Sequence, residues 1–144
     1  MTDPSADNAT PFEVVVIGST PEETVEPKNR ILEALRREQY PEETVFGVKL
    51  ALEEALCNAL KHGNECCPEK KITVRYAVSA EQVEVIVRDE GAGFDPDSVP
   101  DPTTQERLPL PTGRGILLMR AYMDEVEFRD DGREVYFRKR RPKS

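Results

Sequence analysis

Three polar side chains occur at a constant spacing in the stretch LALEEALCNALKHGN, residues 50–64. Glu54, Asn58 and His62 are each four residues apart, which places them along one stripe of a helix. An amide oxygen suits Mg²⁺, because this hard cation is held by few protein oxygens together with water and phosphate. A carboxylate one turn earlier can orient or deprotonate the group that attacks a γ-phosphate. The stripe therefore predicts Asn58 as a Mg²⁺ ligand and Glu54 as the residue that acts on the attacking group.

A simpler interpretation of the same stripe stays open at this point. Glu54 and Asn58 could be ordinary solvent-facing residues of an amphipathic helix. The neighbouring carboxylate, Glu53, is a rival for the catalytic role. It lies about 100° around the helix from Glu54, however, and therefore off the stripe of Asn58.

Two glycine motifs follow the helix. In Asp89-x-Gly91-x-Gly93, at the end of an expected strand, the Asp can accept a hydrogen bond from an exocyclic amine, and the glycines let a ligand ring approach the backbone. Gly113-x-Gly115 opens an expected helix, and helix N-termini bind phosphate through free N–H groups. Each motif is short, and a plain tight turn or a flexible loop end explains it equally well alone.

The elements that must position these residues are predicted from periodicity and from turn residues. We expect a strand at residues 12–18, helices at 28–38 and 41–62, and a hairpin at 71–79 with 82–89. A proline-rich loop at 95–112, a third helix at 116–121 and a last hairpin at 126–128 with 134–138 follow.

Composition restricts the class of protein. The 144 residues predict one domain, and 28 acidic against 20 basic residues give a net charge of −8, which argues against a duplex nucleic-acid partner. We expect no membrane segment and no signal peptide. Three cysteines without disulfide spacing indicate a cytoplasmic protein, and adjacent Cys66-Cys67 is poor spacing for zinc. The basic tail is expected to be solvated rather than bound to nucleic acid.

The order of the motifs is more specific than any one of them. An E-x-x-x-N helix, D-x-G-x-G after a strand, a proline-rich lid and G-x-G at a helix start together resemble the Bergerat ATP-binding fold of the histidine-kinase-like ATPase (GHKL) superfamily. The closer resemblance is to its single-domain branch, the anti-sigma factor serine/threonine kinases. EEALCNALKHGN is similar to that branch's N-box, DEGAGFD to its first glycine box and GRGILLMRAYMDEV to its second.

The resemblance implies an α/β (α+β) two-layer sandwich, with helices on one face of a mixed, mainly antiparallel sheet. It also implies ATP and Mg²⁺ as cofactors. Glu54 matches the general base and Asn58 the Mg²⁺ ligand. The residues that match the nucleotide-binding positions are Asp89, Gly91 and Gly93 at the adenine, and Gly113, Arg114 and Gly115 at the phosphates.

Two positions depart from the pattern. Many relatives carry a Thr near the start of the final strand that supports the adenine aspartate, and the equivalent residue here is Arg133. Some relatives place an Arg just before the second glycine box to contact the γ-phosphate. Here Pro111 and Thr112 occupy that place, which leaves Arg107 or Arg114 as candidates.

The resemblance predicts an ATP-dependent serine/threonine kinase that phosphorylates a STAS-type anti-sigma-factor antagonist, binds a sigma factor and forms a homodimer. Two alternatives stay open, a nucleotide-binding module that sequesters a partner without chemistry and a detached histidine-kinase-type ATPase domain. The predicted organisation is a disordered lead at 1–11, the ATPase domain at 12–139 with a lid at about 94–113, and a basic tail at 140–144.

Overall fold

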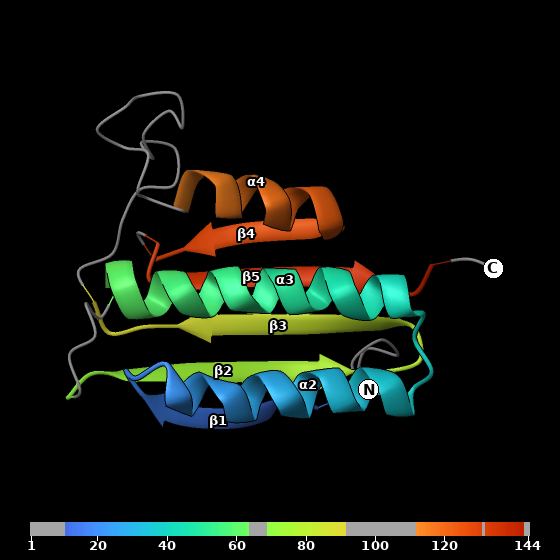
Figure 1. Cartoon of the computed structure of the whole chain (residues 1–144), viewed down its shortest axis with the longest axis horizontal. Helices are drawn as coiled ribbons and strands as arrows, with labels where there is room; N and C mark the ends of the chain where they lie inside the picture. The colour runs from blue at the N-terminus through green and yellow to red at the C-terminus, as the bar shows by residue number, and fades with distance from the viewer. Residues whose placement is uncertain (1–10, 64–68, 92–111, 131, 143–144) are drawn as a thin grey trace, which may run out of the picture.

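The structure is a computed structural model of the whole chain, and it describes residues 11–63, 69–91, 112–130 and 132–142. Helices cover one face of a five-stranded sheet, in two layers (Figure 1). The strands are β1 (Glu13–Gly18), β2 (Lys71–Val78), β3 (Gln82–Arg88), β4 (Glu125–Arg129) and β5 (Glu134–Arg140). The helical segments are η1 (Glu22–Thr24), α2 (Val25–Arg37), α3 (Glu42–Asn58), η2 (Ala59–Gly63) and α4 (Thr112–Tyr122). The predicted two-layer α/β sandwich is confirmed.

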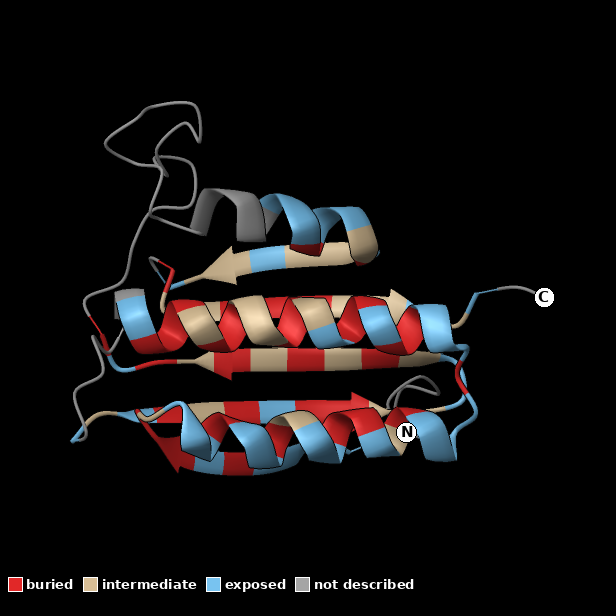
Figure 2. Ribbon diagram, viewed as in Figure 1, coloured by how far each residue is buried: buried red, intermediate tan, exposed pale blue. Residues whose placement is uncertain are grey.

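The sheet has the order β1-β2-β3-β5-β4, and every pair of neighbours among the described strands is antiparallel. Its strands are rich in β-branched residues whose alternate side chains point to opposite faces. On β1, Val15 and Ile17 are buried under the helices, whereas Val14 and Val16 on the other face are 55% and 59% exposed. The same alternation colours the strands in Figure 2. The helices therefore cover one face only.

The first helical segment begins earlier than the expected residue 28. The Glu23 N–H donates to Thr20 Oγ1 at 3.4 Å, and the Thr20 hydroxyl donates to Glu23 Oε2 at 2.7 Å, which ties the chain just before η1 to its first turn. Helix α2 starts at Val25, ahead of the expected Lys28, with Pro27 in its first turn. Proline is tolerated there because the first N–H groups of a helix have no partner within it.

Helix α3 crosses the middle of the sheet and buries two of its largest side chains, Leu52 and Leu56, almost completely. Each such burial stabilises the fold by about 1.5–3 kcal/mol. At Ala59 the helix widens into the π-helical turn η2, which ends at Gly63. The predicted continuation to about His62 is confirmed, and the π-turn is a feature often found at functional sites.

The three motif-bearing segments meet at one end of the sheet, on the left of Figure 1, where α3 and β3 end and α4 begins. The predicted hairpins are confirmed by the β2–β3 and β4–β5 pairings. The lid and the N-terminal lead lie almost wholly outside the described residues.

The C-terminal segment differs from the expected solvated tail. Strand β5 continues to Arg140, and the guanidinium of Arg141 lies over the Tyr40 ring, 4.1 Å from its centroid. Arg141 also donates hydrogen bonds to the carbonyl oxygens of Ala80, Gln39 and Glu38. These carbonyl oxygens lie at the end of α2 and in the β2–β3 turn, outside the regular hydrogen bonding of helix and sheet. Periodicity in the sequence therefore does not predict their contact with Arg141. No helix in the described part of the chain is both long and apolar enough to span a bilayer.

Candidate functional site

Asn58 is the last residue of α3, and its side chain points into the protein rather than into solvent. The residue is 6% exposed, and its buried Oδ1 has no hydrogen-bond partner among the described residues. Leaving a buried acceptor unpaired costs about 1–3 kcal/mol. The solvent-facing interpretation of Asn58 is therefore wrong. An amide oxygen held dry and unpaired is suited to a ligand.

Glu54 lies one turn earlier on the same helix and is half-buried, with its Oε2 also buried and unpaired within the described structure. Burial raises the pKa of the Glu54 carboxyl, the neighbouring charge of Glu53 raises it further, and Lys61 acts in the opposite direction. A carboxylate whose pKa is raised is a better proton acceptor than an ordinary one.

Asp89 directly follows β3 and is only 5% exposed. Its Oδ1 accepts a hydrogen bond from the Gly91 N–H at 2.8 Å, which closes a tight turn across the first glycine motif. Its own N–H donates to the Arg133 carbonyl at 2.8 Å. Burial raises the pKa of the Asp89 carboxyl, against the opposing effects of the Gly91 N–H and of Arg133, Arg88 and Lys70.

Asn58 and Asp89 line one small cavity between α3 and the sheet. Its remaining walls are backbone and apolar side chains, from Ala55, Ala59, Val87, Phe128, Gly132 and Val135. The cavity has a volume of about 10 Å³, room for a single water molecule. The cavity brings one carboxylate and one amide together beside apolar walls. It is much smaller than a purine ring, so the walls must separate to admit one.

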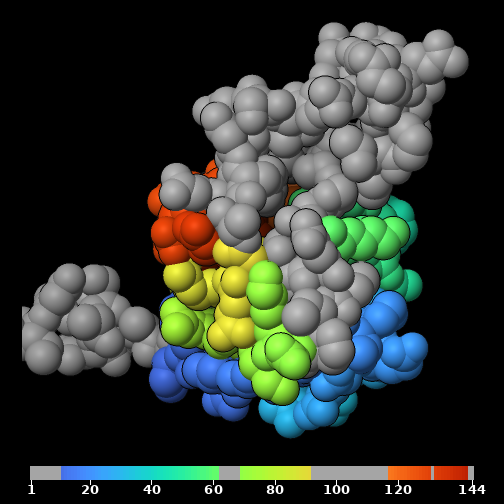
Figure 3. Space-filling model, turned by 90° about the vertical axis from the view of Figure 1, so that its left-hand side faces the viewer, coloured from blue at the N-terminus to red at the C-terminus, as the bar shows by residue number. Residues whose placement is uncertain are grey.

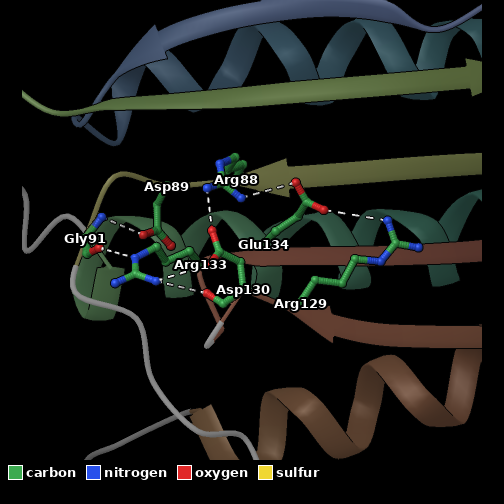
Figure 4. Close-up of polar contacts among 7 residues, drawn as sticks. All are labelled: Arg88, Asp89, Gly91, Arg129, Asp130, Arg133 and Glu134. Carbon is green, nitrogen blue, oxygen red and sulfur yellow. Dashed lines mark hydrogen bonds and ion pairs between the residues drawn. The ribbon is translucent and has the colours of Figure 1, made fainter.

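Sequence reasoning missed the side-chain role of Arg133. Its Nε donates to the Gly91 carbonyl at 2.8 Å, and its Nη1 lies 3.4 Å from Asp130 Oδ1 (Figure 4). The position had been identified as a departure from the related pattern. Its contacts depend on the close approach of the β4–β5 turn to the end of β3, which no local pattern in the sequence encodes.

The second glycine motif lies in the first turn of α4. Gly113, Arg114 and Gly115 belong to the helix, which begins at Thr112, earlier than the expected residue 116. Gly93 and Arg107 lie outside the described residues. His62 falls within η2. Figure 3 views the site end, with the ends of α3 in green and β3 in yellow and the β4–β5 turn in red.

The residues present fit Mg²⁺ and a nucleotide on one direct observation, the unpaired buried oxygen of Asn58. It is a hard, neutral donor of the kind that Mg²⁺ accepts alongside phosphate oxygens. The Glu54 oxygen is unpaired as well. The described site residues therefore supply one candidate metal ligand, one candidate base and one buried carboxylate for a ring amine.

Comparisons with known proteins identify the family of the chain. Residues 17–139 match the family described as histidine kinase-like ATPase domain. The anti-sigma F factor of Clostridium perfringens is 26% identical over 103 residues, which cover 68% of this chain and 74% of that protein. The serine-protein kinase RsbW of Bacillus subtilis is 32% identical over 95 residues, which cover 60% of this chain and 58% of that protein.

Among solved structures, a crystal structure of the RsbU and RsbW domains of Rv1364c from Mycobacterium tuberculosis shares the fold. It superposes with a TM-score of 0.60 at 16% identity, and the match covers 91% of this chain and 32% of that one. The family match extends over most of the chain, from the end of β1 to the end of β5. The chain belongs to the histidine kinase-like ATPase domain family.

Proposed function

We propose that this protein is an ATP-dependent serine/threonine kinase that acts as an anti-sigma factor and phosphorylates a STAS-type anti-sigma-factor antagonist. The observation that carries the proposal is the pairing of Asn58 and Asp89 around one cavity, with the unpaired carboxylate of Glu54 one turn before Asn58. Relatives named anti-sigma F factor and serine-protein kinase RsbW support the same reading.

In this proposal each site residue has one task. Asp89 accepts a hydrogen bond from the adenine amine, and Gly91 keeps the turn open to the ring. Asn58 holds Mg²⁺, which supplies neutralisation of the phosphate charges. Gly113, Arg114 and Gly115, at the start of α4, bind phosphate oxygens through the helix N-terminus and the Arg side chain, and Gly93 lines the base pocket.

The chemical step is an in-line displacement. The hydroxyl oxygen of the substrate Ser or Thr bonds to the γ-phosphorus while the bond to the β–γ bridging oxygen breaks, and ADP leaves. The hydroxyl proton passes to the Glu54 carboxylate. Burial raises the pKa of that carboxyl, which makes it a stronger base than an ordinary glutamate. Phosphoryl transfer needs mainly positioning and charge neutralisation, and a single base suffices.

The partners follow from the proposed class. They are an antagonist protein that receives the phosphate and a sigma factor that is held inactive, and the kinase works as a cytoplasmic homodimer. Neither nucleic acid nor a membrane is a direct partner, in keeping with the net charge of −8.

The test is phosphate transfer from Mg-ATP to a cognate antagonist protein. Glu54→Ala should lower the transfer rate by about 10²–10⁴-fold, the typical contribution of a positioned base, and leave ATP affinity close to that of the wild type. Glu53→Ala is the matched control, because Glu53 is the adjacent half-buried carboxylate off the stripe of Asn58. Full transfer by Glu54→Ala, or none by the wild type, contradicts the proposal.

A second candidate, nucleotide binding and partner capture without chemistry, is favoured by the two departures from the related pattern, Arg133 and the absence of an Arg directly before the second glycine motif. It predicts ATP and partner binding with no phosphoprotein formed. The third, histidine-kinase chemistry in another chain, predicts an acid-labile phosphohistidine on the acceptor. Identifying the modified residue type in the same assay therefore separates all three.

A further inference from the structure

Arg133, in the turn that leads into β5, is bonded to both ends of the turn that carries Asp89. Its carbonyl accepts the Asp89 N–H at 2.8 Å, and its Nε donates to the Gly91 carbonyl at 2.8 Å. The Gly91 N–H in turn donates to Asp89 Oδ1 at 2.8 Å. The three bonds form a closed circuit, drawn in part in Figure 4, in which the Asp89 carboxylate cannot rotate without breaking one of them.

The guanidinium of Arg133 is itself held from its other side. Its Nη1 lies 3.3 Å from the Asp130 carbonyl and 3.4 Å from Asp130 Oδ1, and Asp130 also pairs with Arg88. Asp130 has φ 53° and Gly132 has φ 84°, so the β4–β5 turn adopts the left-handed conformations that bring Arg133 against Gly91. Arg133 is therefore held both at Gly91 and at Asp130.

The electrostatic surroundings of Asp89 depend on the same side chain. The cations whose charge acts on Asp89 are Arg133, Arg88 and Lys70. From α3, the polar residue that shares its cavity is the neutral Asn58. Burial raises the pKa of the Asp89 carboxyl, and Arg133 is the first of the three cations in opposing that rise. An ionised carboxylate presents only acceptors to an exocyclic amine, whereas a protonated carboxyl also carries an O–H donor.

We propose that Arg133 is the positioning residue for base recognition, which holds Asp89 in the orientation that selects a 6-amino purine over a 6-oxo purine. The inference rests on the proposed nucleotide site. With Oδ1 held by Gly91, Oδ2 is the oxygen that takes the amine hydrogen. A 6-oxo group brings an acceptor against the same oxygen, and an unpaired acceptor in a buried site is strongly rejected.

The experiment measures the affinity of the full chain for Mg-ATP and Mg-GTP by calorimetry between pH 5 and 8. Arg133→Met should weaken Mg-ATP by about tenfold at pH 7.5, the effect of losing one charge-assisted hydrogen bond. It should also reduce the preference for ATP over GTP. Because the variant lacks the opposing cation, the pKa of Asp89 rises further, and the loss of ATP affinity on acidification should begin at a higher pH than in the wild type.

Two further variants separate geometry from charge and from folding. Arg133→Lys keeps the cation but not the planar guanidinium. Its loss of ATP affinity on acidification (the acid limb) should therefore begin at the same pH as in the wild type, while only part of the wild-type ATP affinity is retained. Arg129→Met is the matched control. Arg129 contacts Glu127 and Glu134 in the same charged group, so its removal should change neither selectivity nor the acid limb. Unfolding without nucleotide checks that each variant is folded.

The inference is overturned if Arg133→Met keeps the ATP affinity of the wild type, its preference for ATP over GTP and its loss of ATP affinity at the same acidic pH. So does an equal loss for ATP and GTP without a shift of the acid limb, since that is the signature of a merely structural arginine. A wild-type protein that binds neither nucleotide overturns the proposed function itself and the inference with it, and this outcome is distinct from the other two.

Discussion

The polar groups near the two ends of helix α3 differ in their hydrogen bonding. At the end where α3 stops, on the left of Figure 1, Glu54 Oε2 and Asn58 Oδ1 are buried and unpaired within the described structure. At the end where α3 starts, the Tyr40 hydroxyl donates to the Ser79 carbonyl at 2.8 Å, and Arg141 covers the Tyr40 ring. A third buried and unpaired atom, Nε of Arg138, belongs to a guanidinium that still reaches Glu125 at 3.1 Å.

This difference indicates which end of α3 stabilises the fold and which end has polar groups available to a ligand. Buried polar groups are normally paired, and each exception in a native structure calls for a reason. The two unpaired oxygens at the site end lower the free energy of unfolding. The hydrogen bonds at the other end and the apolar centre of α3 offset that loss. Functional sites commonly violate local rules in this way. The comparison predicts that substitutions at the two ends change stability in opposite directions.

The largest effect is expected from Arg141→Ala at the paired end. The variant loses the contact with the Tyr40 ring and the hydrogen bonds to three backbone carbonyls. These contacts are partly exposed, so we expect the free energy of unfolding to fall by about 2 kcal/mol. Urea denaturation measures it. ATP affinity should not change, and a loss of affinity equal to that of a site-end variant would break the comparison.

A smaller effect in the same direction is expected from Tyr40→Phe. The ring and its packing remain, and only the hydroxyl bond to Ser79 is lost, so unfolding should need about 1 kcal/mol less. Tyr136→Phe is a useful control on the open face, because it removes one hydroxyl bond, to Glu84 at 2.7 Å, away from both ends of α3.

The opposite sign is expected at the site end. Glu54→Gln removes a buried, unpaired charge, so the free energy of unfolding without nucleotide should rise by roughly 0.5–1 kcal/mol at pH 7.5. Phosphate transfer should be lost in the same variant. A destabilised Glu54→Gln protein would show that the site end is held together by this carboxylate, and the contrast between the ends would fail.

The pH dependence of that gain sharpens the comparison. Because burial raises the pKa of Glu54 in the folded protein, the folded state binds this proton more tightly than the unfolded state does. The stability gain of the Gln variant is therefore full above the raised pKa. It shrinks as the pH falls toward the ordinary value of 4.5, where wild-type Glu54 is neutral too. Thermal unfolding of both proteins across that range measures the difference.

Local pattern predicted the elements well, because each is coded by neighbours in the chain. Alternation gave both hairpins, and helical periodicity predicted the helix as far as His62, which lies in the π-helical turn η2 that follows α3. It also ranked Glu54 over Glu53, from azimuth alone. The placement of Asn58 and Asp89 around one cavity was accessible only through the resemblance, since they lie on different elements.

The contacts that sequence could not predict are those between turns. The clamp of Arg133 on Gly91 needs the β4–β5 turn to lie against the end of β3, and the Arg141 contacts need the end of β5 to lie against the α2–α3 connection. Basic residues at such positions have the composition of a solvated surface or tail. Only the sheet order β3-β5-β4 brings Arg133 within reach of the first glycine motif.

The central claim, that Asp89 and Asn58 form one Mg-nucleotide site, is tested most directly by the thermal shift that ATP produces with and without Mg²⁺. The account predicts a Mg-dependent rise in the unfolding temperature of the wild type. It predicts no rise in Asp89→Asn, whose amide presents donors as well as an acceptor to the base amine, and unfolding without nucleotide confirms that this variant is folded. A wild-type shift in Asp89→Asn, or no shift in the wild type at millimolar Mg-ATP, would contradict it.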